Sequence, residues 1–184
     1  MNDALLVIDM QQFVQQRLDQ GIEAYPQQAI AQGLALLEAY RRCQRPIIHI
    51  YHHDHDSGAT LHQDKPAALP LTGYQPLPHE KFFIKHGSSA FTDTGLHQHL
   101  CAEGIDHLTV IGAVTGFCVN STVRAAADLG LAVTLIDDAT LSFALSEPTF
   151  GAELLWSSTL ALLAADFAQV TSFSQWQAQH EDYL

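Results

Sequence analysis

The chain has 184 residues, which favours a single domain over residues 1–184 and is enough chain to bury a sizeable hydrophobic core. Apolar residues make up 47% of the chain, a proportion typical of globular proteins rather than disordered ones. The 20 acidic and 8 basic side chains give a net charge of −12, and such a surface repels phosphate backbones and anionic lipids. The composition therefore argues against a nucleic-acid partner and against a role at membrane surfaces.

The first residues and the cysteines indicate the cellular compartment. The opening MNDALLVIDMQQ has no basic region, and its apolar run at residues 4–8 is too short for a signal peptide. No stretch approaches the length of a membrane span. The cysteines Cys43, Cys101 and Cys118 are odd in number and widely spaced, unlike a disulfide framework or a zinc site. We therefore expect a cytoplasmic protein in a reducing environment.

Strand-like and helix-like segments alternate along the chain. The apolar run at residues 4–8 predicts a strand that is buried on both faces. A helix is predicted over residues 25–43, where Pro26 suits the first turn and apolar residues recur at helical spacing. Further strands are predicted at residues 46–51, 82–84, 108–111, 131–136 and 169–173. Further helices are predicted at residues 94–103, 118–129, 146–163 and 175–183, the third of them with Ser146 as cap and Pro148 in its first turn.

This alternation predicts a fold class and the edge at which a site lies. Strands separated by helices favour parallel pairing, and hence a Rossmann-like three-layer α/β/α fold with a mainly parallel sheet of about six strands. Ligands of such folds bind beyond the carboxyl ends of the strands. Asp9, Tyr51, Lys85 and the turn at residues 112–118 all lie at or just beyond predicted strand ends. The long loop at residues 52–79 is rich in His, Pro and Asp and is suited to forming a pocket wall or an oligomer contact.

Cys118 is the candidate nucleophile because it opens a predicted helix after a turn that contains Gly112 and Gly116. Unpaired backbone N–H groups and the helix dipole favour a thiolate there, which predicts a lowered pKa for Cys118. The same N–H groups are suited to binding a developing oxyanion. Most free cysteines are small buried hydrophobes, and Cys43 and Cys101, which lie inside predicted helices, are interpreted in that way.

Asp9 and Lys85 are the candidate partners of Cys118. Asp9 ends the apolar run of LLVIDMQ, where burying a carboxylate is costly without a partner, although a helix cap or a turn residue also fits. Lys85 follows the apolar residues of FFIKHGSSAF, where a solvated loop lysine is the alternative. Brought together, the aspartate takes the thiol proton and returns it to a leaving group. The lysine keeps the aspartate ionised, and the sulfur attacks a carbonyl carbon.

Four segments of the chain resemble motifs of the isochorismatase-like cysteine hydrolases. The segment GAVTGFCVNSTVRAA is similar to the family's signature around its nucleophile, and ALLVIDMQ is similar to its first strand with the catalytic aspartate. KHGSSAF and GLAVTLIDDAT resemble two further family segments. The four occur in the family's order between residues 4 and 143.

The resemblance implies an isochorismatase-like fold and a catalytic triad of Asp9, Lys85 and Cys118 that needs no cofactor. It also implies a non-proline cis peptide bond between Ala113 and Val114, and an oxyanion hole formed by the backbone N–H groups of Val114 and Cys118. The implied reaction is hydrolysis of a C–N bond in a small amide, carbamoyl or ureido compound through a thioester. The implied partners are a small-molecule substrate and further copies of the chain in a dimer or tetramer.

Three other functions stay open: an isochorismatase-type vinyl ether hydrolase, a nicotinamidase, and a catalytically silent small-molecule-binding module. Vinyl ether cleavage needs no thiol, so Cys118 favours the amidases. Nicotinamidases carry an Asp-x-His metal motif after the second strand and commonly an aspartate in the turn. Here His53-x-His55 lies near the first position and Gly116 occupies the second, and both departures argue against a nicotinamidase.

The histidine-rich run at residues 49–62 has two interpretations. Its His and Asp side chains are of the types that bind metals, but a spacing of two within one loop is weak evidence for a metal site. We therefore predict no metal, and a polar pocket wall or a solvated loop instead. The predicted pocket contains His53 and His55 as substrate contacts, together with Phe13, Tyr51 and Phe117.

Overall fold

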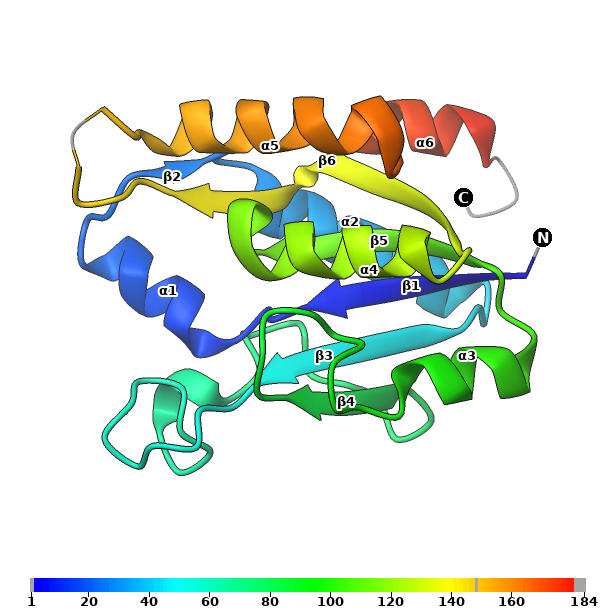
Figure 1. The fold of residues 1–184 in the computed structure, drawn as a ribbon, viewed down its shortest axis with the longest axis horizontal. Coiled ribbons are helices and arrows are strands. Elements are labelled where there is room, and N and C mark those ends of the chain that lie inside the picture. The colour runs from blue at the N-terminus through cyan, green and yellow to red at the C-terminus, as the bar shows by residue number, and fades with distance from the viewer. Residues whose placement is uncertain (1, 148, 181–184) are drawn as a thin grey trace.

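A central sheet with helices on both faces organises the chain in a computed structural model, which describes residues 2–147 and 149–180 (Figure 1). The predicted three-layer α/β/α fold is confirmed, and these described residues form seven strands instead of about six. The strands are β1 (Asp3–Ile8), β2 (Ala24–Tyr25), β3 (Ile47–His52), β4 (Lys81–Lys85), β5 (His107–Ala113), β6 (Ala132–Phe143) and β7 (Gln169–Thr171).

The strand order is β2-β6-β5-β1-β3-β4, with β7 also paired to β6. All of the pairings are parallel except that of β2 with β6. The additional strand is the two-residue β2, too short to show a periodic pattern. Strand β2 is the last strand at one edge of the sheet. It includes residue 25, at which a helix is predicted to begin, and that helix begins instead at residue 29. Parallel strands place their carboxyl ends at one edge, and this edge carries the site described below.

The helices are α1 (Gln12–Asp19), α2 (Ala29–Arg42), α3 (Leu96–Glu103), α4 (Asn120–Asp128), α5 (Ala152–Asp166) and α6 (Phe173–Gln179), with a 3₁₀ turn at Pro66–Ala68 and a π-helical turn at Thr115–Val119. Helix α1 was not predicted. The helix expected from residue 146 begins at Ala152, where the backbone N–H donates to Glu23 Oε1 at 3.0 Å. Pro148 and residues 181–183 of the last predicted helix lie outside the described residues. None of the helices in residues 2–147 and 149–180 combines the length and the apolar character needed to cross a membrane.

Strand β1 shows why its sequence is an uninterrupted apolar run. Leu5 and Val7 point to one face of the sheet and pack in a core with α2 and α6. Ala4, Leu6 and Ile8 point to the opposite face and pack in a second core with α3, α4 and α5. Successive side chains of a strand alternate between the two faces, so a central strand covered on both sides must be apolar throughout. The first polar side chain after this run is Asp9, at the carboxyl edge.

Gly112 allows strands β1 and β5 to approach closely beside that edge. It pairs with Ile8 and has a φ of +132°, and an added Cβ would lie 2.1 Å from the carbonyl oxygen of Ile8. No side chain fits this space, because the obstructing atoms belong to the backbone of β1. Gly112 therefore sets the separation between Asp9, just past β1, and the turn that follows β5.

We predict that Gly112→Ala lowers the free energy of unfolding by at least about 3 kcal/mol, because overpacking adds to the cost of a positive φ. Gly130→Ala is the matched control, since Gly130 has a φ of +83° and nothing within 4 Å of an added Cβ. This control should lose only about 1–2 kcal/mol. Urea unfolding followed by circular dichroism measures both, and equal losses would contradict the close approach.

Candidate active site

Three side chains converge at the carboxyl edge of the sheet. Asp9 follows β1, Lys85 is the last residue of β4, and Cys118 lies in the π-helical turn after β5. Strand β1 pairs with β5 on one side and with β3 on the other, and β3 pairs with β4. The fold therefore brings Asp9 and Cys118, which are 109 positions apart in the sequence, together with Lys85 at one end of four neighbouring strands.

Lys85 is the centre of the cluster. Its side chain is fully buried, and Nζ lies 2.8 Å from Asp9 Oδ2. Nζ also donates to Cys118 Sγ at 3.2 Å and to the carbonyl oxygen of Gly87 at 3.1 Å. His52 Nδ1 is a fourth neighbour at 3.2 Å. The structure thus brings together the three residues that the sequence singled out and adds His52.

The backbone around Asp9 aims its carboxylate into this cluster. Asp9 has a φ of +49°, a left-handed conformation that aspartate tolerates better than most residues, and its N–H donates to Ile50 O at 2.9 Å. Gln11, which is buried, donates to the carbonyl oxygens of His52 and Ala68 and accepts from the N–H of His52. Gln11 therefore fastens the segment after β1 to the end of β3.

Burial dominates the electrostatics of the pair formed by Asp9 and Cys118. It raises the pKa of Asp9 above its usual 3.8, although the Lys85 ammonium opposes the shift. Burial, and then the charge of Asp9, raise the pKa of Cys118 to about 12. The predicted lowering of the Cys118 pKa is therefore wrong, because burial and the charge of Asp9 outweigh the opposing effect of Lys85. The resting thiol keeps its proton beside a carboxylate that is able to accept it.

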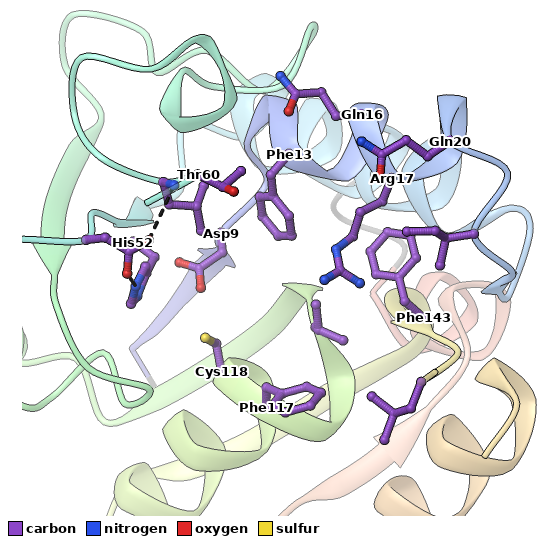
Figure 2. A pocket seen from close by; sticks show the side chains of 15 residues that line it. Asp9, Phe13, Gln16, Arg17, Gln20, His52, Thr60, Phe117, Cys118 and Phe143 are labelled. Carbon is purple, nitrogen blue, oxygen red and sulfur yellow. Dashed lines mark hydrogen bonds and ion pairs between the residues drawn. The ribbon is translucent and has the colours of Figure 1, made fainter. Parts of the chain in front are cut away.

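A cavity of about 520 Å³ opens over these groups (Figure 2). Figure 2 shows Asp9 and Cys118 on one side of this cavity and Arg17 and Phe143 on the other, with Phe13 and Phe117 between them. The complete lining is Asp9, Phe13, Gln16, Arg17, Gln20, Ile22, His52, Asp54, Thr60, Leu61, Val114, Phe117, Cys118, Phe143 and Leu145. Of the predicted pocket residues, Phe13 and Phe117 line the cavity.

Tyr51, His53 and His55 do not line it, which corrects the predicted pocket. Tyr51 is buried and stacks against His49, and His55 stacks against His86 with ring centroids 4.0 Å apart. His52, which lies between Tyr51 and His53, is the residue of this segment that lines the cavity. Side chains alternate along β3, so a shift of one residue changes the face to which a side chain points. His52 is therefore the histidine of the site.

The turn before Cys118 has the predicted covalent geometry. The peptide bond between Ala113 and Val114 is cis. The carbonyl oxygen of Val114 accepts from the N–H groups of Phe117 and Val119 at 3.0 and 3.3 Å, which holds the turn closed. Val114 and Cys118 both line the cavity. Single π-helical turns like this one are frequent at functional sites.

Sequence reasoning predicted Phe13 as a pocket residue but missed helix α1 and the other residues that it brings to this wall, Gln16, Arg17 and Gln20. Phe13, Gln16, Arg17 and Gln20 recur at spacings of three and four, so they share one helical face. The segment QFVQQRLD is mostly polar, and only Val14 of it is buried, so its apolar pattern is too weak to identify a helix. The signal that was available is the spacing of these four residues directly after the candidate Asp9.

The donor atoms in the described part of the chain fit a metal ion poorly. Asp9, His52 and Cys118 offer ligand atoms within 4.8 Å of one another. The Lys85 ammonium, however, contacts an atom of each of them at 2.8–3.2 Å, so a cation already occupies their centre. His53 and His55 belong to no such group among the described residues. The absence of a metal stays a prediction.

A cavity of this kind, at the carboxyl edge of a parallel α/β sheet with ionisable groups on its floor, is the usual arrangement of α/β enzymes. The chain belongs to the isochorismatase family of hydrolases, because the model of the isochorismatase domain matches residues 3–173. It is 27% identical to the isochorismatase family protein YddQ of Bacillus subtilis, over 92% of this chain and 96% of that protein.

Two further relatives extend the comparison. A crystal structure of an isochorismatase family protein from Chromobacterium violaceum superposes with a TM-score of 0.91 at 31% identity, covering 98% of this chain and 94% of that one. Streptothricin hydrolase of Streptomyces noursei is 33% identical over 138 residues, which are 74% of this chain and 48% of that enzyme.

We predict that Asp9→Asn makes Cys118 react faster with iodoacetamide at pH 7.5, by at least about tenfold. The substitution removes a charge that raises the Cys118 pKa and leaves Lys85 in place, and each unit by which a thiol pKa falls gives about ten times more thiolate. Asp54→Asn is the matched control, because Asp54 lines the cavity without contributing to that shift. Peptide mass spectrometry measures the rates.

The same experiment tests the resting state of the wild-type thiol. With a pKa of about 12, Cys118 should react more slowly at pH 7.5 than the exposed Cys101. Faster alkylation of Cys118 than of Cys101 would show a resting thiolate and contradict the protonated state.

Proposed function

We propose that this protein is a cysteine hydrolase that cleaves the C–N bond of a small amide, carbamoyl or ureido compound through a thioester. The observation that carries the proposal is the buried Lys85 ammonium, which contacts both Asp9 and Cys118 beneath the cavity. A thiol nucleophile, a carboxylate that accepts its proton and a cation that orients both are the parts that acyl transfer requires.

In the first half of the reaction, Asp9 takes the thiol proton as Cys118 Sγ forms a bond to the substrate's carbonyl carbon. The electron pair of the C=O bond moves to the oxygen, which the N–H groups of Val114 and Cys118 stabilise. When this intermediate collapses, the C–N bond breaks and Asp9 gives its proton to the leaving nitrogen. The products of this half are a thioester on Cys118 and a free amine or ammonia.

In the second half, a water molecule attacks the thioester carbon and Asp9 takes its proton. The C–S bond then breaks, and Asp9 returns the proton to the sulfur, which restores the resting thiol. The raised pKa of Asp9 suits this shuttle, because an aspartate with its usual pKa is too weak a base to hold the proton. The net reaction consumes one water and one amide bond.

The three alternatives differ in what they require of the site. A vinyl ether hydrolase needs an acid and leaves Cys118 without a role, although Lys85 holds that thiol at 3.2 Å. A nicotinamidase with its metal site would require ligands that His53 and His55 do not supply from where they lie. A silent binding module has no use for the contacts between Asp9, Lys85 and Cys118. The similarity to streptothricin hydrolase also supports a hydrolase, and streptothricin is a candidate substrate.

A homo-oligomer stays a prediction. Apolar side chains of the segment around α5 are available for such an interface: Phe150 and Leu154 are exposed, whereas Trp156 is half-buried and donates to the carbonyl oxygen of Asp137. Leu162, at 60% exposure, adds to the apolar surface of α5.

The test is turnover of a panel of amides by the wild type and by Cys118→Ala. The panel contains nicotinamide, N-carbamoyl amino acids, ureido acids, biuret and streptothricin, with ammonia release and mass spectrometry as readouts. We expect Cys118→Ala to lose at least about a thousandfold in kcat on the compound that the wild type cleaves. Cys101→Ala is the matched control and should keep full activity, since Cys101 is exposed on α3.

Two results would overturn the proposal. Full amide hydrolysis by Cys118→Ala would exclude a thioester. No turnover of any amide, together with tight binding of one of them by the wild type, would favour the binding module.

A further inference from the structure

Arg17 supplies the cavity with a positive charge that the protein itself does not neutralise. It is the only Lys or Arg among the lining residues that the structure describes. Its guanidinium lies over the ring of Phe143, 5.3 Å from the centroid, and makes no hydrogen bond or ion pair with any described residue. In a chain with only 8 basic residues and a net charge of −12, an unpaired cation facing a cavity is unusual.

The other charges of the cavity have partners. Asp9 is paired with Lys85. Asp54 contacts His52 Nε2 at 3.1 Å and accepts from the N–H of Leu61. Neither carboxylate is therefore paired with Arg17, whose exposed guanidinium is free to bind an anionic group of a molecule that enters the cavity.

The neighbours of Arg17 favour an anion of planar geometry. Gln16 in α1 and Gln20 directly after it line the cavity on the same side as Arg17, and their side-chain amides make no hydrogen bond with a described residue. A guanidinium donates two parallel N–H groups to a carboxylate, and amide NH₂ groups add further donors. Between this end and Cys118 the walls are the aromatic rings of Phe13 and Phe117 (Figure 2).

We infer that the substrate is an amide that carries a carboxylate, which binds Arg17 across an apolar spacer from the carbonyl attacked by Cys118. The inference rests on the proposed function for the position of the reacting carbonyl. In this inference Arg17 is a specificity-determining residue, and it lies on the α1 side of the cavity, away from Asp9, Lys85 and Cys118. The carboxylate anchors one end of the substrate, and the spacer lies between Phe13 and Phe117.

Matched pairs of compounds test the charge alone. One pair is 4-carbamoylbenzoate and its methyl ester, which share a flat spacer, and the other is succinamate and its methyl ester, which share a flexible one. We expect the wild type to prefer the carboxylate of at least one pair by about 10- to 100-fold in kcat/KM, since hydrogen bonds to charged groups contribute on that scale. In Arg17→Gln this preference should disappear through a higher KM, with the rate on the ester unchanged.

Two further variants separate recognition from structure. Arg17→Lys should keep part of the preference, because it keeps the charge and loses the planar fork. Arg124→Gln makes the same change of charge on α4 outside the cavity and should keep all of it. Arg17 also lies in the last turn of α1, where a cation stabilises the helix. If Arg17 only stabilised the helix, Arg17→Gln would lower the urea midpoint and keep the preference for the carboxylate. That result would overturn the inference.

Binding to Cys118→Ala gives a readout that does not depend on turnover. Calorimetry should show that 4-carbamoylbenzoate or succinamate binds Cys118→Ala more tightly than its ester does, and about 10- to 100-fold more weakly when Arg17→Gln is added. Carboxylate binding without turnover by the wild type would support Arg17 while contradicting the proposed hydrolysis. Turnover of acids and esters at equal kcat/KM would overturn the role of Arg17 and leave the hydrolysis standing. Equal or undetectable binding of both members of each pair would also overturn it.

Discussion

The site depends on one buried ion pair, formed by the Lys85 ammonium and the Asp9 carboxylate at 2.8 Å. Both side chains are almost completely buried, so each charge would destabilise the fold severely without the other. They come from the ends of β1 and β4, which are separated by β3 in the sheet. The ion pair therefore forms only if β1, β3 and β4 end at the same edge of the sheet, and any change that shifts one of these strands separates the two charges.

The same burial determines where the proton rests. A thiol at the start of a helical turn is expected to lose its proton easily, but removal from water raises the pKa of Cys118 to about 12 and also raises that of Asp9. The Lys85 ammonium opposes the shift of the Asp9 pKa and stabilises the Asp9 carboxylate, so the proton rests on the Cys118 sulfur beside that carboxylate. The raised pKa of Asp9 makes it a stronger base than an ordinary aspartate, which suits a group that must accept and return a proton within one cycle.

The cavity has two walls that come from different parts of the chain. Asp9, His52 and Cys118 form the reactive wall at the ends of the central strands, and α1 forms the opposite wall. Helix α1 begins three residues after Asp9, and Gln11 between them is fastened to the carbonyl oxygens of His52 and Ala68. The reactive carboxylate and the recognition surface of α1 are thus joined by a short, hydrogen-bonded segment, so their relative position is well defined.

The sequence by itself determined the class of fold and singled out the three residues that meet at the carboxyl edge of the sheet. Apolar runs such as residues 4–8 indicate strands buried on both faces, and the first polar residues beyond them, Asp9 and Lys85, are the ones that meet Cys118. A buried charge after an apolar run is a local signal that needs no knowledge of distant segments. The two-residue β2 and the mostly polar α1 lack such a signal and were missed.

Only the tertiary structure decided the protonation state and the recognition surface. The pKa of Cys118 depends on how completely Asp9 and the surrounding chain exclude water, which is a sum over segments far apart in sequence. The choice of His52 over its neighbours Tyr51 and His53 depends on the side to which β3 turns each side chain, and pairing with β1 and β4 fixes that side. Arg17 stands out because it forms no ion pair with any described residue, although Asp9 and Asp54 line the same cavity; this is a property of the assembled cavity and not of α1.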